Sequence, residues 1–156
     1  MTYTEFKKNE QKIADNLPIF FAFSREQFND ACAKRNIPLD GSVKLVALGS
    51  GGYCTKADYP VIKAFLNKKN PLEELMKDYD FAFDAFYYEM GNHEYHINTY
   101  QGDFDVCSCF GNCEWVNELT TGEQYLCDMG YGEETIRAYK DARKKFMHDA
   151  LVNDWY

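Results

Sequence analysis

Two segments with helical hydrophobic periodicity constrain the fold of this chain most strongly. From residue 71 to about residue 90, apolar side chains recur at intervals of three and four, the spacing that places them on one face of an α-helix. The segment EETIRAYKDARKKFMHDALV, near the end of the chain, has the same kind of apolar face. Asn70-Pro71 suits the start of the first helix and Gly91-Asn92 suits its end. The sequence therefore predicts two long amphipathic helices.

Shorter helices and strands are predicted in the first third of the chain. Thr2 and Glu5 have capping-box spacing before a helix, and Ser24 and Gln27 have it before the next one. The run PIFFAFS between them is typical of a short buried strand or a turn. The β-branched run SVKLVAL predicts a strand that leads into the loop GSGGYCTK. We therefore expect an α+β fold, with helices packed around a small, mainly antiparallel sheet.

Length and composition indicate one globular domain over residues 1–156. Hydrophobic residues make up 46% of the chain and aromatic residues 17%, so core material is plentiful and disorder is not expected. The net charge of −8 repels a phosphate backbone, and we expect no nucleic-acid partner. The N-terminus is charged, so we expect no signal peptide, and no segment has the roughly 20 apolar residues of a membrane span. We expect a cytoplasmic protein without membrane contact.

The stretch GNHEYHINTYQGDFDVCSCFGNCEW, residues 91–115, holds two of the three histidines and three of the six cysteines. Two β-rich runs flank a Gln-Gly dipeptide that fits a two-residue turn, so we expect a hairpin at about residues 93–110. Pairing across this turn places His96 opposite Cys107. One face of the hairpin would be mainly apolar, and the other would gather polar side chains.

An enzymatic interpretation places a cysteine nucleophile on the polar face. A thiol nucleophile needs a base within hydrogen-bond reach, and the cross-strand neighbours His96 and Cys107 would meet that requirement. Asn92 and Glu94 would supply polar or proton-transfer groups. A disulfide between Cys107 and Cys109 is not expected, because residues two apart on a strand have poor geometry for the bond.

A zinc interpretation uses the same face. His96, Cys107 and Cys109, with Glu94 or Cys113 as the fourth ligand, would make a tetrahedral set. His93 would be excluded from this ligand set, because it is three residues from His96 and would point to the opposite side of the strand. The cysteine spacing lacks the two-residue interval familiar from zinc sites. We therefore expect no cofactor and keep zinc as an alternative.

The loop GSGGYCTK is a candidate ligand site. Gly51 and Gly52 could present backbone N–H groups to an anion, and Thr55 and Lys56 could add a hydroxyl and a charge. The motif is neither a P-loop nor a dinucleotide fingerprint, and two glycines equally suit a tight turn. A small enzyme or ligand-binding protein would have its pocket between this loop and the predicted hairpin, with Asn92 among the ligand contacts.

Three segments carry a family resemblance. In order, FFAFSREQF, KLVALGSGGYCTK and EMGNHEYHI resemble a family of small proteins of unknown function from bacteriophages and mobile elements of gut bacteria. The resemblance covers roughly the first 100 residues. It implies an accessory protein that works in a bacterial cytoplasm, and it carries no activity, cofactor or catalytic residue. In that context, binding to a host protein is favoured over metabolism.

The function that the sequence predicts is a non-enzymatic, protein-binding module. No strong catalytic motif is found, and aromatic residues are numerous; such residues dominate interfaces when they are exposed. A contiguous exposed apolar patch would favour this prediction. The alternatives are the small enzyme or ligand-binding protein and a structural zinc site within residues 93–113.

Overall fold

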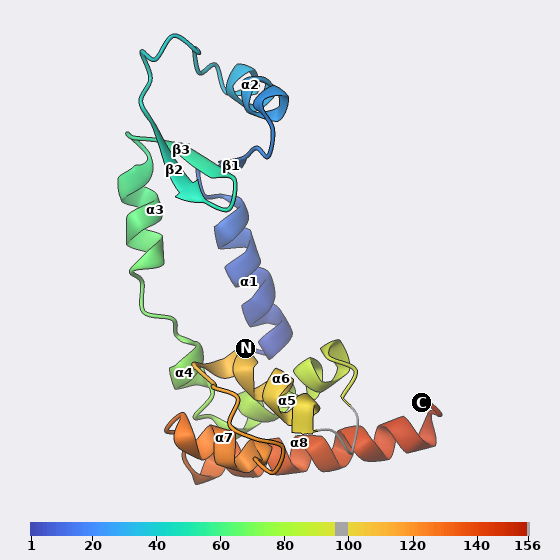
Figure 1. The fold of residues 1–156 in the computed structure, drawn as a ribbon. Coiled ribbons are helices and arrows are strands. Elements are labelled where there is room, and N and C mark those ends of the chain that lie inside the picture. Colours follow the sequence, from blue (N-terminus) through green and yellow to red (C-terminus); the bar gives the residue numbers. More distant parts are fainter. Residues whose placement is uncertain (96–99, 156) are drawn as a thin grey trace. The chain divides into compact units, whose positions relative to one another are not determined.

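The fold is of the α+β class, as predicted (Figure 1). The computed structural model describes residues 1–95 and 100–155. The chain divides into two compact units: the sheet unit, Glu10–Lys69, and the helical unit, Met1–Asn9 with Asn70–Tyr156. That the whole chain is a single domain stays a prediction. No helix in the described part of the chain is long and apolar enough to cross a lipid bilayer.

Most of the described elements are helices, and the strands lie between residues 20 and 55. In order they are α1 (Tyr3–Asp15), β1 (Phe20–Phe21), α2 (Arg25–Lys34), β2 (Leu45–Gly49), β3 (Gly52–Thr55), α3 (Tyr59–Leu66), α4 (Leu72–Leu75), α5 (Tyr79–Asn92), α6 (Tyr100–Cys107), the 3₁₀-helix η1 (Ser108–Phe110), α7 (Gly122–Asp128) and α8 (Glu133–Val152).

The predicted capping box of α1 is complete, and that of α2 has its Ser24 cap, whereas the Gln27 side chain accepts from the Phe23 N–H in place of the Ser24 N–H. At the start of α1, the Glu5 N–H donates to Thr2 Oγ1 at 3.2 Å, and the Thr2 N–H donates to Glu5 Oε2 at 2.8 Å. At the start of α2, the Gln27 N–H donates to Ser24 Oγ at 3.1 Å. These bonds satisfy backbone donors that the first turn of a helix leaves without partners.

The sheet unit contains three antiparallel strands in the order β1–β3–β2. The predicted strand SVKLVAL is β2, and it forms a hairpin with β3 in which Leu45 pairs with Thr55. Positive φ angles at Ser50 and Gly51 reverse the chain between them. Phe20, Cys32 and Ile37 form a buried core cluster of this unit.

The helical unit is organised around α5, which packs along α8 (Figure 1). Phe86 of α5 is fully buried in the core of the helical unit. Its ring makes edge-on contacts with Phe110 at 4.8 Å and with Tyr139 at 5.3 Å between centroids. Such aromatic pairs add to the free energy of apolar burial.

The predicted helix from residue 71 to about residue 90 is two helices, α4 and α5. Asp78 has an extended backbone conformation, and its carboxylate accepts a hydrogen bond from the Phe81 N–H at 2.9 Å. This is an N-cap, so a new helix begins at Tyr79. The apolar spacing continues through the break because both helices pack side chains against the same core.

The predicted hairpin at residues 93–110 is wrong, because its second half is the helix α6 followed by η1. A strand would turn Val106 and Cys107 to opposite sides and would point Ser108 the same way as Val106. The structure instead buries Val106, Cys107 and Phe110 together and exposes Ser108. Packing into the core of the helical unit thus overrides the local β propensity.

A close approach between α7 and α8 requires glycine at residue 122. Asp103 of α6 accepts hydrogen bonds from the Tyr139 hydroxyl at 2.5 Å and from the Gly122 N–H at 3.1 Å. A Cβ atom added at Gly122 would lie 2.2 Å from the Tyr139 Oη. Because Tyr139 is buried and bonded to Asp103, its hydroxyl cannot move aside without losing that bond.

We expect Gly122→Ala to lower the free energy of unfolding by about 1–3 kcal/mol, the usual cost of overpacking. Gly91→Ala is the matched control, since its added Cβ would meet only the Phe146 ring at 3.7 Å. Alanine also favours the α5 helix by roughly 0.5–1 kcal/mol over glycine. Urea unfolding should therefore give changes of opposite sign for the two variants. A Gly122→Ala variant as stable as the wild type would contradict the close approach.

Candidate functional site

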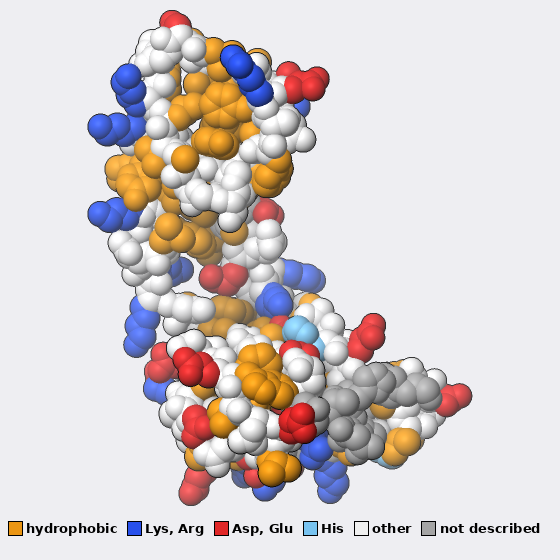
Figure 2. Space-filling view, viewed as in Figure 1, with side chains coloured by type: hydrophobic (Ala, Val, Ile, Leu, Met, Phe, Trp, Pro, Cys, Tyr) orange, Lys and Arg blue, Asp and Glu red, His pale blue; other side chains and the backbone are white. Residues whose placement is uncertain are grey.

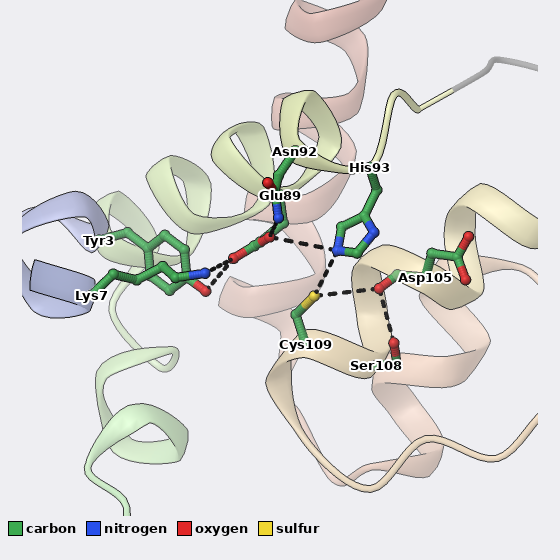
Figure 3. Close-up of polar contacts among 8 residues, drawn as sticks. All are labelled: Tyr3, Lys7, Glu89, Asn92, His93, Asp105, Ser108 and Cys109. Atoms are coloured by element: carbon green, nitrogen blue, oxygen red, sulfur yellow. Dashed lines mark hydrogen bonds and ion pairs between the residues drawn. The ribbon is translucent and has the colours of Figure 1, made fainter. Parts of the chain in front are cut away.

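Three chemically reactive side chains converge where α5 ends (Figure 3). Glu89 lies in the last turn of α5, His93 is the residue that caps this helix, and Cys109 lies in η1. The interval of four residues places Glu89 and His93 on the same side of the helix. A carboxylate oxygen, an imidazole nitrogen and the thiol sulfur all lie within 4.8 Å of one another. We call these three residues the Glu-His-Cys cluster.

Glu89 is a buried carboxylate whose two oxygens have different partners. It is 1% exposed. Its Oε1 accepts hydrogen bonds from the Tyr3 hydroxyl at 2.6 Å and from Lys7 Nζ at 2.9 Å, and its Oε2 accepts one from Asn92 Nδ2 at 2.9 Å. Burial by itself would raise the pKa of Glu89, but these hydrogen bonds outweigh it and hold the pKa below 4.5. The side chain is therefore an anion at neutral pH.

His93 faces both other members of the cluster with one ring nitrogen. Its Nε2 lies 3.3 Å from Cys109 Sγ and 3.6 Å from Glu89 Oε2. In a catalytic Cys-His-acid arrangement, the thiol and the acid contact different ring nitrogens, so that the acid orients the base. The cluster instead gathers three donor atoms around one point.

The Cys109 thiol does not have the character of an activated nucleophile. Burial, followed by the nearby Glu89 carboxylate, raises its pKa to about 11. Its Sγ donates to the Asp105 carbonyl at 3.4 Å. Nucleophilic cysteines have pKa values lowered by cations or helix N-termini. The local electrostatics therefore give little support to a catalytic thiol at this position.

The sheet unit carries a second candidate, a pair of exposed phenylalanines. Phe21 is 61% exposed and Phe23 is 76% exposed. Each ring lies against a glycine of the β2–β3 hairpin: a Cβ added at Gly51 would be 2.5 Å from the Phe23 ring, and one at Gly52 would be 3.3 Å from the Phe21 ring. We call Phe21, Phe23 and these two glycines the aromatic surface. Gly51 also has a positive φ angle, which disfavours other residues at this position.

The backbone around Phe23 is held in place by hydrogen bonds. The Phe23 N–H donates to Gln27 Oε1 at 2.9 Å, and the Ala22 N–H donates to the Gly51 carbonyl at 2.9 Å. The Ser24 cap of α2 fixes Gln27 in turn. The Phe23 ring is therefore exposed to solvent on a backbone that the fold fixes.

Comparison with protein families matches residues 2–113 to a family of unknown function, DUF7659. The chain belongs to this family. The matched residues include the aromatic surface and the whole Glu-His-Cys cluster, whereas α7 and α8 lie beyond them. No curated protein and no solved structure matches the chain. The match confirms the predicted relation to proteins of unknown function.

The predicted ligand residues of the GSGGYCTK loop lie in the sheet unit. The predicted loop is largely the strand β3: Gly51 lies in the turn between β2 and β3, and Gly52 is the first residue of β3. Both glycines lie under the aromatic rings. The Thr55 hydroxyl donates to the Asp58 carboxylate at 2.7 Å, and Lys56 follows β3 with an exposed side chain. Binding of a small ligand by these residues stays a prediction.

The structure brings two predicted residues of the helical unit to the Glu-His-Cys cluster. Cys109 is a member, and Asn92 orients Glu89. Cys107 is buried elsewhere in the core, where its Sγ lies 3.7 Å from the Gly122 carbonyl and burial raises its pKa. Cys113 is half-buried, and burial raises its pKa too.

Sequence reasoning missed Glu89 and His93 as partners. The predicted hairpin placed His93 on a strand, facing away from the polar set. Extending the preceding helix past residue 91 would have shown that residues 89 and 93 share a helix face. Glu94 is exposed and has a positive φ angle. The predicted cross-strand pairing of His96 with Cys107 is wrong together with the hairpin, because Cys107 lies in α6, and His96 itself lies outside the described residues.

We expect Cys109 in the folded chain to react with iodoacetamide about tenfold more slowly at pH 8 than in the urea-unfolded chain. A pKa raised from 9.0 to about 11 leaves roughly a hundredfold less thiolate. The greater nucleophilicity of a more basic thiolate recovers about tenfold of that loss. Peptide mass spectrometry resolves this cysteine from the others.

The pH dependence of the alkylation rate distinguishes a raised pKa of Cys109 from steric shielding of its thiol. The rate for folded Cys109 should keep rising above pH 9, where the rate for the unfolded chain levels off. A folded-state rate that is already level at neutral pH would show a stabilised thiolate and would revive the enzymatic interpretation.

Proposed function

We propose that this chain is a non-enzymatic protein-binding module that contacts its partner through the aromatic surface. The observation that carries the proposal is Phe23, which is 76% exposed on a backbone held by hydrogen bonds and by the Gly51 turn. Aromatic side chains provide much of the binding free energy at interfaces, and a ring with few rotatable bonds loses little entropy on binding. An exposed ring with a fixed backbone meets both conditions.

The charge of the sheet unit suggests the chemistry of the partner. Residues 10–69 contain nine lysines and arginines and six aspartates and glutamates, a net charge of +3 within a chain of net charge −8. Figure 2 shows lysine and arginine side chains at the margin of the hydrophobic side chains of this unit. Arg25 lines the same shallow pocket as Phe23. A partner segment with apolar and acidic side chains would complement this surface.

The biological context of the proposal is an accessory protein of a phage or mobile element, with a host protein as the partner in a bacterial cytoplasm. Two of the three segments that carry the family resemblance, FFAFSREQF and KLVALGSGGYCTK, supply all the residues of the aromatic surface. The six cysteines are free thiols, the state that a reducing cytoplasm maintains. Both observations support the proposal.

We expect the Phe23→Ser variant to lose peptide binding. Random displayed peptides panned against the purified chain should converge on acidic sequences with apolar residues, and these should bind the variant at least about tenfold more weakly, as for a hot-spot residue. Fluorescence anisotropy with labelled peptides measures the affinities. Circular dichroism checks that the variant is folded.

Leu66→Ser is the matched control. Leu66 is 70% exposed on α3 in the same unit but does not belong to the aromatic surface. Peptides that bind Phe23→Ser and Leu66→Ser equally well would contradict the proposal, and so would a panning that enriches no peptide. A labelled single-stranded oligonucleotide tests general attraction of polyanions: tight binding of it would also contradict a protein partner.

A further inference from the structure

We propose that the Glu-His-Cys cluster is a zinc site, in which Glu89 Oε2, His93 Nε2 and Cys109 Sγ bind one Zn²⁺ ion. The Nε2 atom lies 3.3 Å from Sγ and 3.6 Å from Oε2. In a tetrahedral site with bonds of about 2.0–2.3 Å, donor atoms lie roughly 3.3–3.8 Å apart. Both distances from Nε2 are therefore those of a zinc tetrahedron, and the third pair, Sγ and Oε2, lies within 4.8 Å.

The donor types select the metal. Zinc binds imidazole nitrogen, thiolate sulfur and carboxylate oxygen, whereas calcium and magnesium require sets of oxygen ligands. Three protein ligands leave a fourth position for water. The His93 side chain is 34% exposed, so an ion can reach the cluster from solvent. The proposal concerns the helical unit and does not depend on peptide binding by the aromatic surface.

The residues around Glu89 support its role as a ligand. Tyr3 and Lys7 bind Oε1, while Asn92 binds Oε2 and leaves this oxygen facing the imidazole (Figure 3). Hydrogen bonds of this kind hold a ligating carboxylate in one orientation. The carboxylate therefore needs no rearrangement to place Oε2 on the metal.

Bound zinc would join α5 to η1 within the helical unit. Glu89 and His93 belong to the end of α5, whereas Cys109 comes from η1. Because this arrangement exists only in the folded chain, zinc should raise the temperature of unfolding. The Lys7 ammonium, 2.9 Å from Glu89 Oε1, is the nearest positive charge on the carboxylate. Lys7→Gln should therefore tighten zinc binding, since it removes this repulsion.

Titration of the untagged, reduced and metal-free full chain with Co²⁺ and then Zn²⁺ tests the site. One equivalent of Co²⁺ should give a thiolate-to-cobalt charge-transfer band, and one equivalent of Zn²⁺ should displace it. Cys109→Ser should remove the band and weaken zinc binding by at least about tenfold. His93→Gln should weaken zinc binding similarly, without changing the unfolding temperature of the metal-free chain, because His93 lies outside the buried core.

Cys127→Ser is the control for adventitious binding. Cys127 is an exposed thiol on α7 outside the Glu-His-Cys cluster, so this variant should keep the stoichiometry and affinity of the wild type. The proposal is overturned if the wild type binds less than one equivalent. It is equally overturned if Cys109→Ser and His93→Gln, both folded by circular dichroism, bind zinc like the wild type.

Discussion

The helical unit depends on the hydrogen bonds that satisfy the buried carboxylate of Glu89. An isolated carboxylate out of water costs several kcal/mol, so Glu89 requires partners wherever it is buried. Tyr3 supplies one from a position 86 residues away in the sequence, and Lys7 supplies another. The start of α1 is thus fastened to the end of α5 by the need to satisfy one charge. The Tyr3 ring contributes apolar contacts with Phe81 and Phe110 at the same place.

The same hydrogen bonds explain the chemistry of the Glu-His-Cys cluster. Because Oε1 is occupied by the N-terminal helix, Oε2 alone faces His93 and Cys109. Burial of Cys109 first, and then the Glu89 anion, disfavour a thiolate without a metal, which is the opposite of what a nucleophilic cysteine needs. It favours a divalent cation. One structural constraint therefore argues against catalysis and for metal binding.

The sheet unit differs from the helical unit in the kind of side chain that it exposes. The helical unit buries a charge with its partners, whereas the sheet unit exposes Phe21 and Phe23 on top of a glycine turn. Glycine has two consequences at this turn: it permits the positive φ angle at Gly51, and it leaves room for the Phe23 ring. A motif that looked like an anion-binding loop thus also serves as the support of an apolar contact surface.

The sequence by itself determined the elements whose causes are local. The capping box of α1, the Ser24 cap of α2, the amphipathic face of α8 and the strand β2 follow from neighbouring residues, and the sequence predicted all of them. It also pointed to Cys109 and Asn92 as site residues. It failed at α6, because burial of Val106 and Cys107 on one side of a helix depends on side chains far away in the chain.

Only the tertiary structure decided which groups meet. Glu89 and His93 became partners of Cys109 because α5 continues past residue 91 and η1 packs beside its end. Likewise, the two phenylalanines lie on the glycine turn because β1 pairs with β3. Helix caps and amphipathic faces depend on interactions within a few residues, which a sequence displays directly. A site assembled from separate segments depends on the free energy of packing the whole unit.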